Sequence, residues 1–337
     1  MTLRVSPEPA ATLAEVAREA GVSIATASRV LNNSPRVSPD AHRRVCAAAS
    51  RLRYVRQRAA APATGRGVRS VAVVVHAEHR RLFGDAFFSR LITAAGAALA
   101  EHDVALLVVS VTEASRPTVG RYLHGGHVDG LIVVSDHGRQ PLAGSLPTLG
   151  IPVAVVGRPL QPSTAPYVDA DNRGGARRAV EYLVEHGRRA VAHIAGPPDM
   201  VAGADRLAGY RDALRDNPDL PVAYGDWTQA AGVHAMARLL DQRPRLDAVF
   251  AASDAMAIGA LRALARAGRR VPDDVAVVGF DDHPLAQRVT PALTTVRQPI
   301  EEFGVVAARY LLAASGAPGP LPAATILPTT LVVRDST

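Results

Sequence analysis

From Val71 onward, short apolar runs alternate with segments of helical period. The expected strands are 71–75, 104–109, 130–134, 153–156, 190–194, 248–251 and 275–279. The expected helices are 88–101, 173–186, 204–215, 228–241 and 255–267. Strands that are apolar throughout and alternate with helices form parallel sheets covered by helices on both faces. The pattern therefore predicts an α/β body built on parallel sheets.

A polar, proline-containing break at 161–166 divides this body into two similar halves. The chain is expected to cross back near 294–299, so that each half also holds part of the C-terminal segment. The expected lobes are 71–160 plus 296–324 for the first, and 161–295 plus 325–333 for the second. Ligands of such sheets bind beyond the carboxyl ends of the strands, which predicts a small-molecule cleft between the lobes.

Charge separates the first 66 residues from the body. They hold eleven arginines and four acidic residues, a net charge of +7, whereas the remaining 271 residues hold 27 of each. Every cationic side chain of the chain is arginine, because the sequence contains no lysine. A basic head on a neutral body indicates that the head binds a polyanion.

The basic head reads as three short helices, at 12–19, 24–31 and 39–53. Thr12, Ser23 and Ser38 are placed to cap them, and Gly21 permits the tight turn between the first two. Two short helices joined by such a turn are typical of a helix-turn-helix, whose second helix enters the major groove of DNA. The sequence thus predicts that double-stranded DNA is a partner.

The second of these helices carries side chains suited to reading DNA. Arginine binds guanine O6 and N7 with two hydrogen bonds, and small apolar groups fit the thymine methyl, so Arg29, Ile24 and Ala25 are expected to contact bases. Ser23, Thr26 and Ser28 are expected to donate to phosphates, and Arg36, Arg43 and Arg44 are placed for contacts to the DNA backbone. Thr12 is assigned to the DNA contact as well. The alternative interpretation is that the arginines form an ordinary solvated surface.

The sequence lacks the residues that several other functional classes require. The segment after 71–75 is not G-x-G-x-x-G, and a lysine-dependent phosphate loop is impossible without lysine. The histidine pairs 76/79 and 124/127 have no evident third and fourth ligands, so no metal or other cofactor is expected. A single cysteine, Cys46, excludes a disulfide framework and is expected to be buried. We therefore expect a protein that is not an enzyme.

Neither a signal peptide nor an apolar run of membrane-spanning length is present in the sequence. The expected location is the cytoplasm, without membrane association.

The segment TLAEVAREAGVSIATASRVLNN at 12–33, followed by VS at 37–38 and RLRY at 51–54, resembles the DNA-binding headpiece of the lactose-repressor (LacI/GalR) family. The resemblance continues through Gly150-Ile151-Pro152-Val153, Asp169-Ala170-Asp171-Asn172, Arg206-Leu207-Ala208-Gly209-Tyr210, Ser253-Asp254-Ala255-Met256, Gly279-Phe280-Asp281-Asp282 and Thr290-Pro291. It implies a headpiece at 1–57, a linker at 58–70, and an effector-binding and dimerisation domain at 71–337 that is folded like a periplasmic sugar-binding protein. In that family the positions of Ile24, Ala25 and Arg29 recognise bases, and Tyr54 and Arg58 are assigned to the DNA contact as well.

The linker departs from the family pattern. Family members usually place a hinge helix here, whose leucine wedges into the minor groove. Residues 54–66, YVRQRAAAPATGR, contain no leucine and place Pro62 inside the would-be helix. A hinge helix and a flexible linker rich in alanine, proline and glycine therefore remain alternatives.

The resemblance also implies the effector site. Arg206 and Asp281 match positions that hydrogen-bond the small ligand, and Trp227 matches an aromatic that stacks on a sugar or a base. The other residues assigned to the site are Phe88, Arg158, Ser253 and Asp254. Phe88 and Trp227 have core packing as an alternative role.

The expected function is a homodimeric, sequence-specific transcriptional regulator, a repressor, controlled by a small effector between its lobes. Met200 and Ala202 stand where purine-responsive members carry polar groups, which favours a sugar over a purine. The alternative from another class is a cytoplasmic sugar-sensing protein whose basic head is incidental.

Overall fold

The structure is a computed structural model that describes residues 12–31, 37–52, 68–76, 82, 84–134, 150–215, 217, 220–314 and 322–337. The chain divides into two compact units, with the three N-terminal helices in one and both β-sheets in the other. Three candidate DNA contacts, Arg36, Tyr54 and Arg58, lie outside the described residues, as does Pro62 of the linker.

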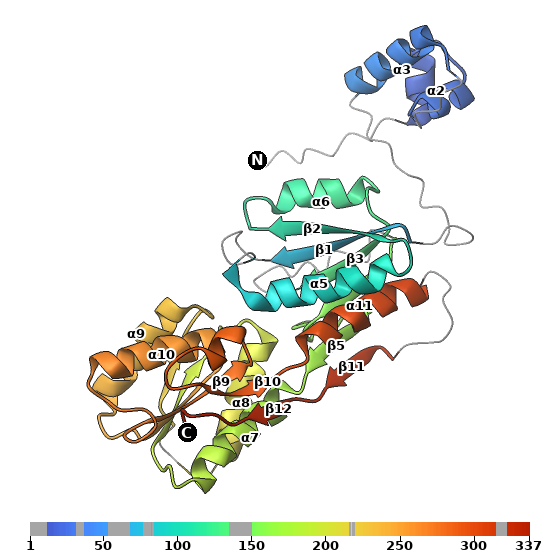
Figure 1. Ribbon diagram of the computed structural model, residues 1–337. Helices are drawn as coiled ribbons and strands as arrows, with labels where there is room; N and C mark the ends of the chain where they lie inside the picture. Colours follow the sequence, from blue (N-terminus) through green and yellow to red (C-terminus); the bar gives the residue numbers. More distant parts are fainter. Residues whose placement is uncertain are drawn as a thin grey trace, which may run out of the picture. The chain divides into compact units, whose positions relative to one another are not determined.

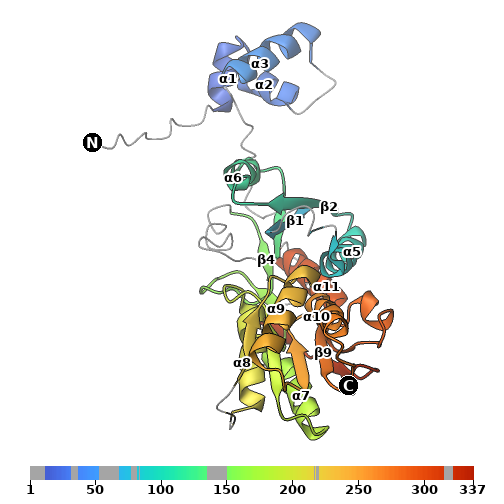
Figure 2. The same ribbon diagram turned by 90° about the vertical axis from the view of Figure 1, so that its left-hand side faces the viewer.

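The headpiece consists of α1 (Leu13–Glu19), α2 (Ile24–Leu31) and α3 (Pro39–Arg51), labelled in Figure 2. Thr12 begins α1 with a capping box, because its hydroxyl accepts from the Glu15 amide while the Glu15 carboxylate accepts from the Thr12 amide. Gly21 has a φ of 61°, a conformation that glycine adopts without strain, and it turns the chain into α2. The headpiece core comprises Val16, Ala17, Ala20, Ala27, Val30, Val45 and Ala48. The predicted three-helix arrangement is confirmed.

The first sheet of the body has six parallel strands in the order β11-β5-β4-β3-β1-β2. Its strands are β1 (Ser70–His76), β2 (Ala105–Val111), β3 (Gly130–Val134), β4 (Val153–Val156), β5 (Tyr167–Ala170) and β11 (Ala324–Leu327). Helices α5 (Ala86–Ala100) and α11 (Ile300–Ala314) lie side by side and share a core with this sheet (Figure 1). Helix α6 (Arg116–His124) follows β2 in the chain.

The second sheet has the order β12-β10-β9-β8-β6-β7, parallel except for β12. Its strands are β6 (Val191–Ala195), β7 (Val222–Tyr224), β8 (Ala248–Ala251), β9 (Ala276–Asp281), β10 (Thr294–Arg297) and β12 (Thr330–Val332). The accompanying helices are α7 (Asn172–Glu185), α8 (Val201–Ala213), α9 (Gln229–Gln242), α10 (Asp254–Arg266) and the short 3-10 helix η3 (Pro284–Gln287).

Strand β8 shows why its sequence is apolar throughout. Ala248 and Phe250 belong to the core that α7 and α8 cover, whereas Val249 and Ala251 belong to the core that α9 and α10 cover. Because successive strand residues point to opposite faces, a strand between two helical layers must be apolar at every position.

The two sheets repeat one topology. The orders β2-β1-β3-β4-β5 and β7-β6-β8-β9-β10 are the same when each sheet is numbered from its own first strand. This confirms the predicted α/β body of two similar lobes with parallel sheets.

The expected lobe boundary at 160–161 is wrong. Strand β5 pairs with β4 in the first sheet, and β11 pairs with β5 there, although residues 161–170 and 325–327 were expected in the second lobe. The break at 161–166 is a loop between two strands of one sheet. The chain passes between the sheets in the three short segments after β5, after β10 and between β11 and β12.

Two further expectations differ from the structure. Helix α11 was not predicted, although its buried residues Ile300, Phe303, Ala307 and Leu311 follow the helical period. Cys46, expected to be buried, is exposed, because α3 turns Val45 and Ala48 toward the headpiece core instead.

None of the helices within the described ranges combines the length and the apolar character needed to cross a membrane.

Candidate functional site

The exposed face of α2 carries the predicted base-reading residues. Ile24, Ala25 and Arg29 are exposed, with Ile24 at 55%, whereas Ala27 and Val30 on the opposite face are buried. The exposed apolar side chain of Ile24 at the start of the helix is of the kind that contacts a thymine methyl. Ser23 begins the helix, where its hydroxyl accepts from the Thr26 amide at 3.1 Å and meets the Thr26 hydroxyl at 2.8 Å. This face matches the side-chain set expected for the major groove.

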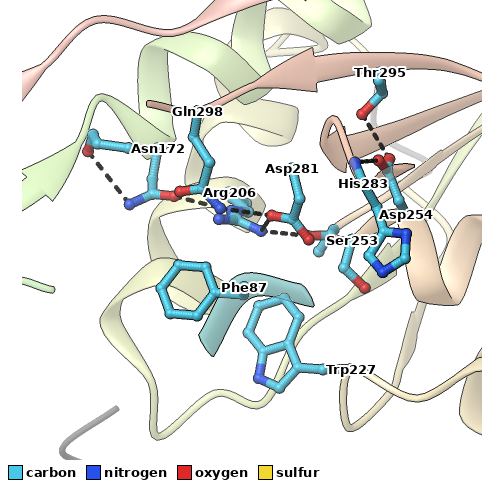
Figure 3. A network of polar contacts seen from close by, with 12 residues as sticks. Phe87, Asn172, Arg206, Trp227, Ser253, Asp254, Asp281, His283, Thr295 and Gln298 are labelled. Atoms are coloured by element: carbon cyan, nitrogen blue, oxygen red, sulfur yellow. Dashed lines mark hydrogen bonds and ion pairs between the residues drawn. The ribbon is translucent and has the colours of Figure 1, made fainter. Parts of the chain in front are cut away.

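A cavity lies beyond the carboxyl ends of the strands and is lined by residues of both sheets and their helices. Of the predicted effector residues, Phe88, Arg158, Arg206, Trp227, Ser253 and Asp281 line it. Other lining residues include Asp85, Phe87, Asp169, Asn172, Met200, Ala202, His283 and Gln298. Figure 3 shows the polar network at its centre.

Arg206 of α8 is the centre of the network, and only 4% of it is exposed. Its Nε donates to Asn172 Oδ1 at 2.9 Å, and its NH1 donates to the Ala252 carbonyl at 2.5 Å and to Asp281 Oδ1 at 3.3 Å. The guanidinium also lies 3.7 Å from the centre of the Phe280 ring. Burial lowers the pKa of Arg206, but an arginine stays charged at neutral pH, so it presents a fixed positive charge to the cavity.

Asp281 faces Arg206 from the end of β9. Its Oδ1 also accepts from Gln298 Nε2 at 2.7 Å. Burial raises the pKa of Asp281 to about 7; Arg206 opposes this rise, and the nearby Asp85 carboxylate adds to it. Backbone φ is 115° at Asp281 and 50° at the next residue, Asp282, a conformation that costs a non-glycine residue about 1–3 kcal/mol. Such strain is characteristic of functional sites.

Trp227 forms an aromatic wall of the cavity. Its ring lies directly against Gly196, where any side chain would collide with it, and its Nε1 donates to Met200 Sδ at 3.1 Å. Its own φ is 72°, a strained conformation for a bulky residue, held just before Thr228 caps α9. Phe87 lies beside Trp227 in Figure 3 and also lines the cavity. Two aromatic faces next to an Arg–Asp pair suit a ring with one apolar face and hydroxyls at its edge.

Phe88 combines two roles that were treated as alternatives. It is 1% exposed and belongs to the core of the first sheet, and it also lines the cavity. Ser253 caps α10 by accepting from the Met256 amide at 3.3 Å, which places its hydroxyl at the cavity edge.

Arg158 follows β4, and its side chain forms a two-pronged ion pair with Asp205 at 2.7 and 2.8 Å. Its backbone amide donates to Asp169, and burial raises the pKa of that carboxyl. Arg158 therefore borders the cavity while its charge is largely satisfied by Asp205.

Asp254 does not belong to the cavity lining, contrary to the expectation from the sequence. Its Oδ1 accepts from the Thr295 hydroxyl, and its Oδ2 accepts from the His283 amide at 2.7 Å. The carboxylate lies directly against Gly279, where a side chain would collide with it. Both oxygens are thus used to hold the loop that follows β9 against α10, and burial keeps the pKa of Asp254 well above its usual value.

The sequence reasoning missed Asn172 and Gln298 as site residues. Asn172 is 2% exposed, and its amide donates to Asp169 while its carbonyl oxygen accepts from Arg206. Gln298 is 4% exposed and contacts Asp281. Both lie in segments where the chain passes between the sheets. A buried amide next to two of the three crossings is a tertiary feature, and the available signal, for Asn172, was the Asp169-Ala170-Asp171-Asn172 motif.

Comparison with known proteins agrees with both parts of the structure. Residues 12–57 match the model of bacterial regulatory proteins of the lacI family, and residues 180–337 match that of a periplasmic binding protein-like domain. The HTH-type transcriptional regulator CelR of Thermobifida fusca is 43% identical over 96% of this chain and 98% of its own.

Solved structures give the same result. A transcriptional regulator CelR–cellobiose complex has a TM-score of 0.77 at 42% identity and covers 97% of this chain and 100% of its own. The lac repressor dimer bound to operator and an anti-inducer has a TM-score of 0.67 at 28% identity, over 97% and 98% of the two chains. These relatives are transcriptional regulators and not enzymes, as the sequence led us to expect. With a helix-turn-helix headpiece, a two-lobed body and relatives of this identity over nearly its whole length, the chain belongs to the lacI family of bacterial regulatory proteins.

Proposed function

We propose that the protein is a dimeric, cytoplasmic repressor that binds a pseudo-palindromic operator and responds to a sugar in the cavity between its lobes. The observation that carries the proposal is the presence, in one chain, of an exposed DNA-reading face on α2 and a cavity centred on Arg206 and Asp281. Two headpieces related by a two-fold axis would read two half-sites related by the same symmetry.

The chemistry of the cavity supports a sugar as the effector. Asp281 can accept hydrogen bonds from two neighbouring hydroxyls and Arg206 can donate to a ring or hydroxyl oxygen, while Trp227 and Phe87 offer apolar faces. Met200 and Ala202 add apolar lining where a nucleobase would need polar partners. The CelR–cellobiose complex makes cellobiose the first sugar to test.

The segments in which the chain passes between the two sheets would link sugar binding to the arrangement of the lobes. Asn172 follows the first crossing and holds Arg206, and Gln298 lies in the second crossing and holds Asp281. A sugar that is bound by Arg206 and Asp281 would therefore favour one angle between the lobes, because the effector binds that state more tightly. The changed angle would alter the spacing of the two headpieces and hence the affinity for the operator.

The test begins with operator selection from a random DNA library, followed by binding measurements with and without cellobiose. Arg29→Ala should lose preference for the selected sequence but keep non-specific DNA binding. Asp281→Asn should keep operator binding and lose the response to the sugar. The proposal fails if the wild-type protein selects no sequence, or if the Asp281→Asn variant responds to the sugar like the wild type.

A purine effector is the alternative outcome of the same experiment. Nucleobases and nucleosides are titrated beside cellobiose and other disaccharides, with fluorescence of Trp227, the single tryptophan of the sequence, as the signal. A purine that shifts operator affinity while no sugar does would replace the sugar in the proposal.

A further inference from the structure

The end of β9 and the turn that follows it carry two carboxylates that serve different partners. Asp281 contacts Arg206 and Gln298 at the cavity, whereas Asp282 contacts Arg297 and Arg334. Both aspartates have positive φ, 115° and 50°, in a region that residues with side chains rarely adopt. Because the backbone preference of aspartate does not favour these φ values, contacts with other parts of the chain must hold the two residues in this conformation.

The contacts of Asp282 provide that restraint. Arg334 NH2 donates to Asp282 Oδ1 at 2.6 Å, and Arg297 Nε donates to Asp282 Oδ2 at 2.7 Å. Only 7% of the Asp282 side chain is exposed, and 12% of the Arg334 side chain. Although burial alone would raise it, the two ion pairs hold the pKa of Asp282 below its usual value. The carboxylate is therefore charged and fixed at both oxygens.

Both arginines are themselves fixed to the second sheet. Arg297 belongs to β10 and is the register partner of Asp281 in β9. Arg334 lies beyond β12, where its NH1 donates to the Leu293 carbonyl at 2.7 Å and its amide donates to the Thr294 hydroxyl at 2.9 Å. The segment is anchored again at Ser336, whose hydroxyl donates to the Val277 carbonyl at 2.6 Å. Because both the Arg334 guanidinium and the segment that carries it are hydrogen-bonded to the sheet, the guanidinium holds Asp282 in a fixed position.

We propose that Arg334 and Arg297 are positioning residues for effector binding, which hold Asp282 so that the left-handed turn presents the Asp281 carboxylate to hydroxyls in the cavity. The inference rests on the proposed function, because it concerns the residue that would bind the sugar. It assigns the C-terminal segment a role in ligand affinity, although neither arginine lines the cavity.

The turn has a reporter that needs no ligand. The His283 amide, one residue after Asp282, donates to the buried Asp254 carboxylate at 2.7 Å. Amide hydrogen exchange at His283 in the full-length protein therefore measures whether the turn is closed. We expect Arg334→Gln to speed amide exchange at residues 281–283 about tenfold, while amides of α7 and β8 keep the wild-type rate. Arg297→Gln, at a more exposed side chain, should give a smaller increase and provides the variant to use if Arg334→Gln fails to fold.

Glycine at position 282 separates positioning from general stability, because glycine adopts positive φ without strain and leaves no buried carboxylate to pair. The double variant Arg334→Gln/Asp282→Gly should return exchange to within about threefold of wild type. Arg270→Gln is the matched control, since it breaks an exposed ion pair with Asp274 in the same lobe, away from the cavity. It should leave amide exchange at 281–283 unchanged.

The second readout is the dissociation constant of the sugar that the effector screen identifies, measured with the same variants. We expect Arg334→Gln to raise the dissociation constant about tenfold. Adding Asp282→Gly in the double variant should restore most of the affinity, and Arg270→Gln should leave the affinity unchanged. Wild-type exchange and affinity in both Arg297→Gln and Arg334→Gln would overturn the inference, as would a failure of Asp282→Gly to rescue. If no sugar binds the wild-type protein, the proposed function fails, whereas the exchange measurement still decides whether the arginines hold the turn.

Discussion

Gln298 Nε2 donates a hydrogen bond to Asp281 Oδ1 at 2.7 Å, which ties a segment passing between the two sheets to the carboxylate at the centre of the cavity. Asn172 makes the corresponding contact with Arg206 after another crossing. Arg206 and Asp281, the ion pair at the centre of the cavity, are therefore each bonded to a buried amide side chain at a crossing. Changes at the cavity and changes in the angle between the lobes should be coupled through these contacts.

Gln298→Leu should weaken this coupling. Leucine has nearly the same size but cannot donate, so Asp281 loses one of its two described partners. We expect the sugar to bind about tenfold more weakly and, at saturation, to shift operator affinity less than in the wild type. Isothermal titration and operator binding by fluorescence anisotropy measure the two effects. An unchanged operator response at saturating sugar would show that Gln298 does not transmit the signal.

Sugar affinity should depend on pH through Asp281. A hydroxyl donates to the charged carboxylate, and the pKa of Asp281 in the free protein is raised to about 7, so protons compete with the sugar. We expect binding to be about tenfold weaker at pH 6 than at pH 8. Asp281→Asn should bind weakly at both values, without this slope. A dependence that persists in Asp281→Asn would point to another group, such as His283.

The same pKa has a consequence for the free protein. Because the folded-state pKa of Asp281 lies above its unfolded value of 3.8, this group stabilises the folded state fully below about pH 4, and its contribution is lost as the pH rises to about 7. Asp281→Asn should therefore raise the free energy of unfolding at pH 8 more than at pH 5. Urea denaturation at the two values tests the sign.

His193 should make the second lobe sensitive to acid. It is fully buried between Tyr210 and Phe250, its Nδ1 contacts the Phe250 carbonyl at 2.8 Å, and Nε2 has no hydrogen-bond partner among the described residues. Burial lowers the pKa of His193 from 6.5 to about 4. The unfolded chain then binds the proton more readily, so stability is complete above pH 6.5 and is lost as the pH falls toward 4. Between pH 7.5 and 5 the loss should be about 2 kcal/mol.

His193→Phe tests this assignment. Phenylalanine keeps the stacked aromatic packing but cannot titrate, so the free energy of unfolding should lose most of its dependence on pH between 7.5 and 5. Substituting the exposed His186 by phenylalanine is the control and should keep the wild-type slope. Equal slopes in both variants and the wild type would refute the role of His193.

Arg29 should contribute specificity, and Arg266 should not. Arg29→Ala is expected to lose about 1–3 kcal/mol of discrimination between the selected operator and a sequence changed at one base pair. Arg266→Ala removes the same charge from the exposed surface of α10 and should leave discrimination unchanged. Competition binding at a fixed salt concentration measures both. If the two variants behave alike, α2 does not read bases through Arg29.

Met200 should control the environment of Trp227. Met200→Leu keeps an apolar side chain of similar size but removes the sulfur that accepts from the indole N–H. We expect a shifted emission maximum of Trp227 and a sugar affinity reduced several-fold, because the ring loses a contact that fixes its orientation. An unchanged emission spectrum would contradict the hydrogen bond. Met236→Leu, at a buried residue of α9 that does not line the cavity, is the control.

Local sequence patterns were sufficient for the elements with strong periodicity. Caps and apolar spacing predicted the headpiece helices to within two residues, and continuous apolar runs predicted the strands β1, β3, β4 and β8. The short strands β5, β10, β11 and β12 were missed, because each has only three or four residues, at least one of them polar, and so makes no continuous apolar run. The Cys46 prediction was wrong because the usual burial of cysteine does not tell which face of a helix it occupies.

Among the candidate effector residues, sequence could not separate Asp254 from Asp281. Both are aspartates in motifs of the family, and both lie at or just after the carboxyl end of a strand of the same sheet. Their roles differ because Thr295 and the His283 amide occupy the oxygens of Asp254, whereas the positive φ of Asp281 turns its carboxylate toward Arg206.

The sequence by itself determined the class of protein, a basic helix-turn-helix on a neutral α/β body. Periodicity, capping and charge reveal this class because each depends only on residues that are close together in the chain. The tertiary structure alone decided where the lobes divide and which polar side chains meet, since β5 and β11 pair across more than 150 residues, and Gln298 reaches Asp281 from the crossing segment after β10. Such contacts depend on how the sheets assemble. They join segments that are separated in the chain, so no local sequence pattern predicts them.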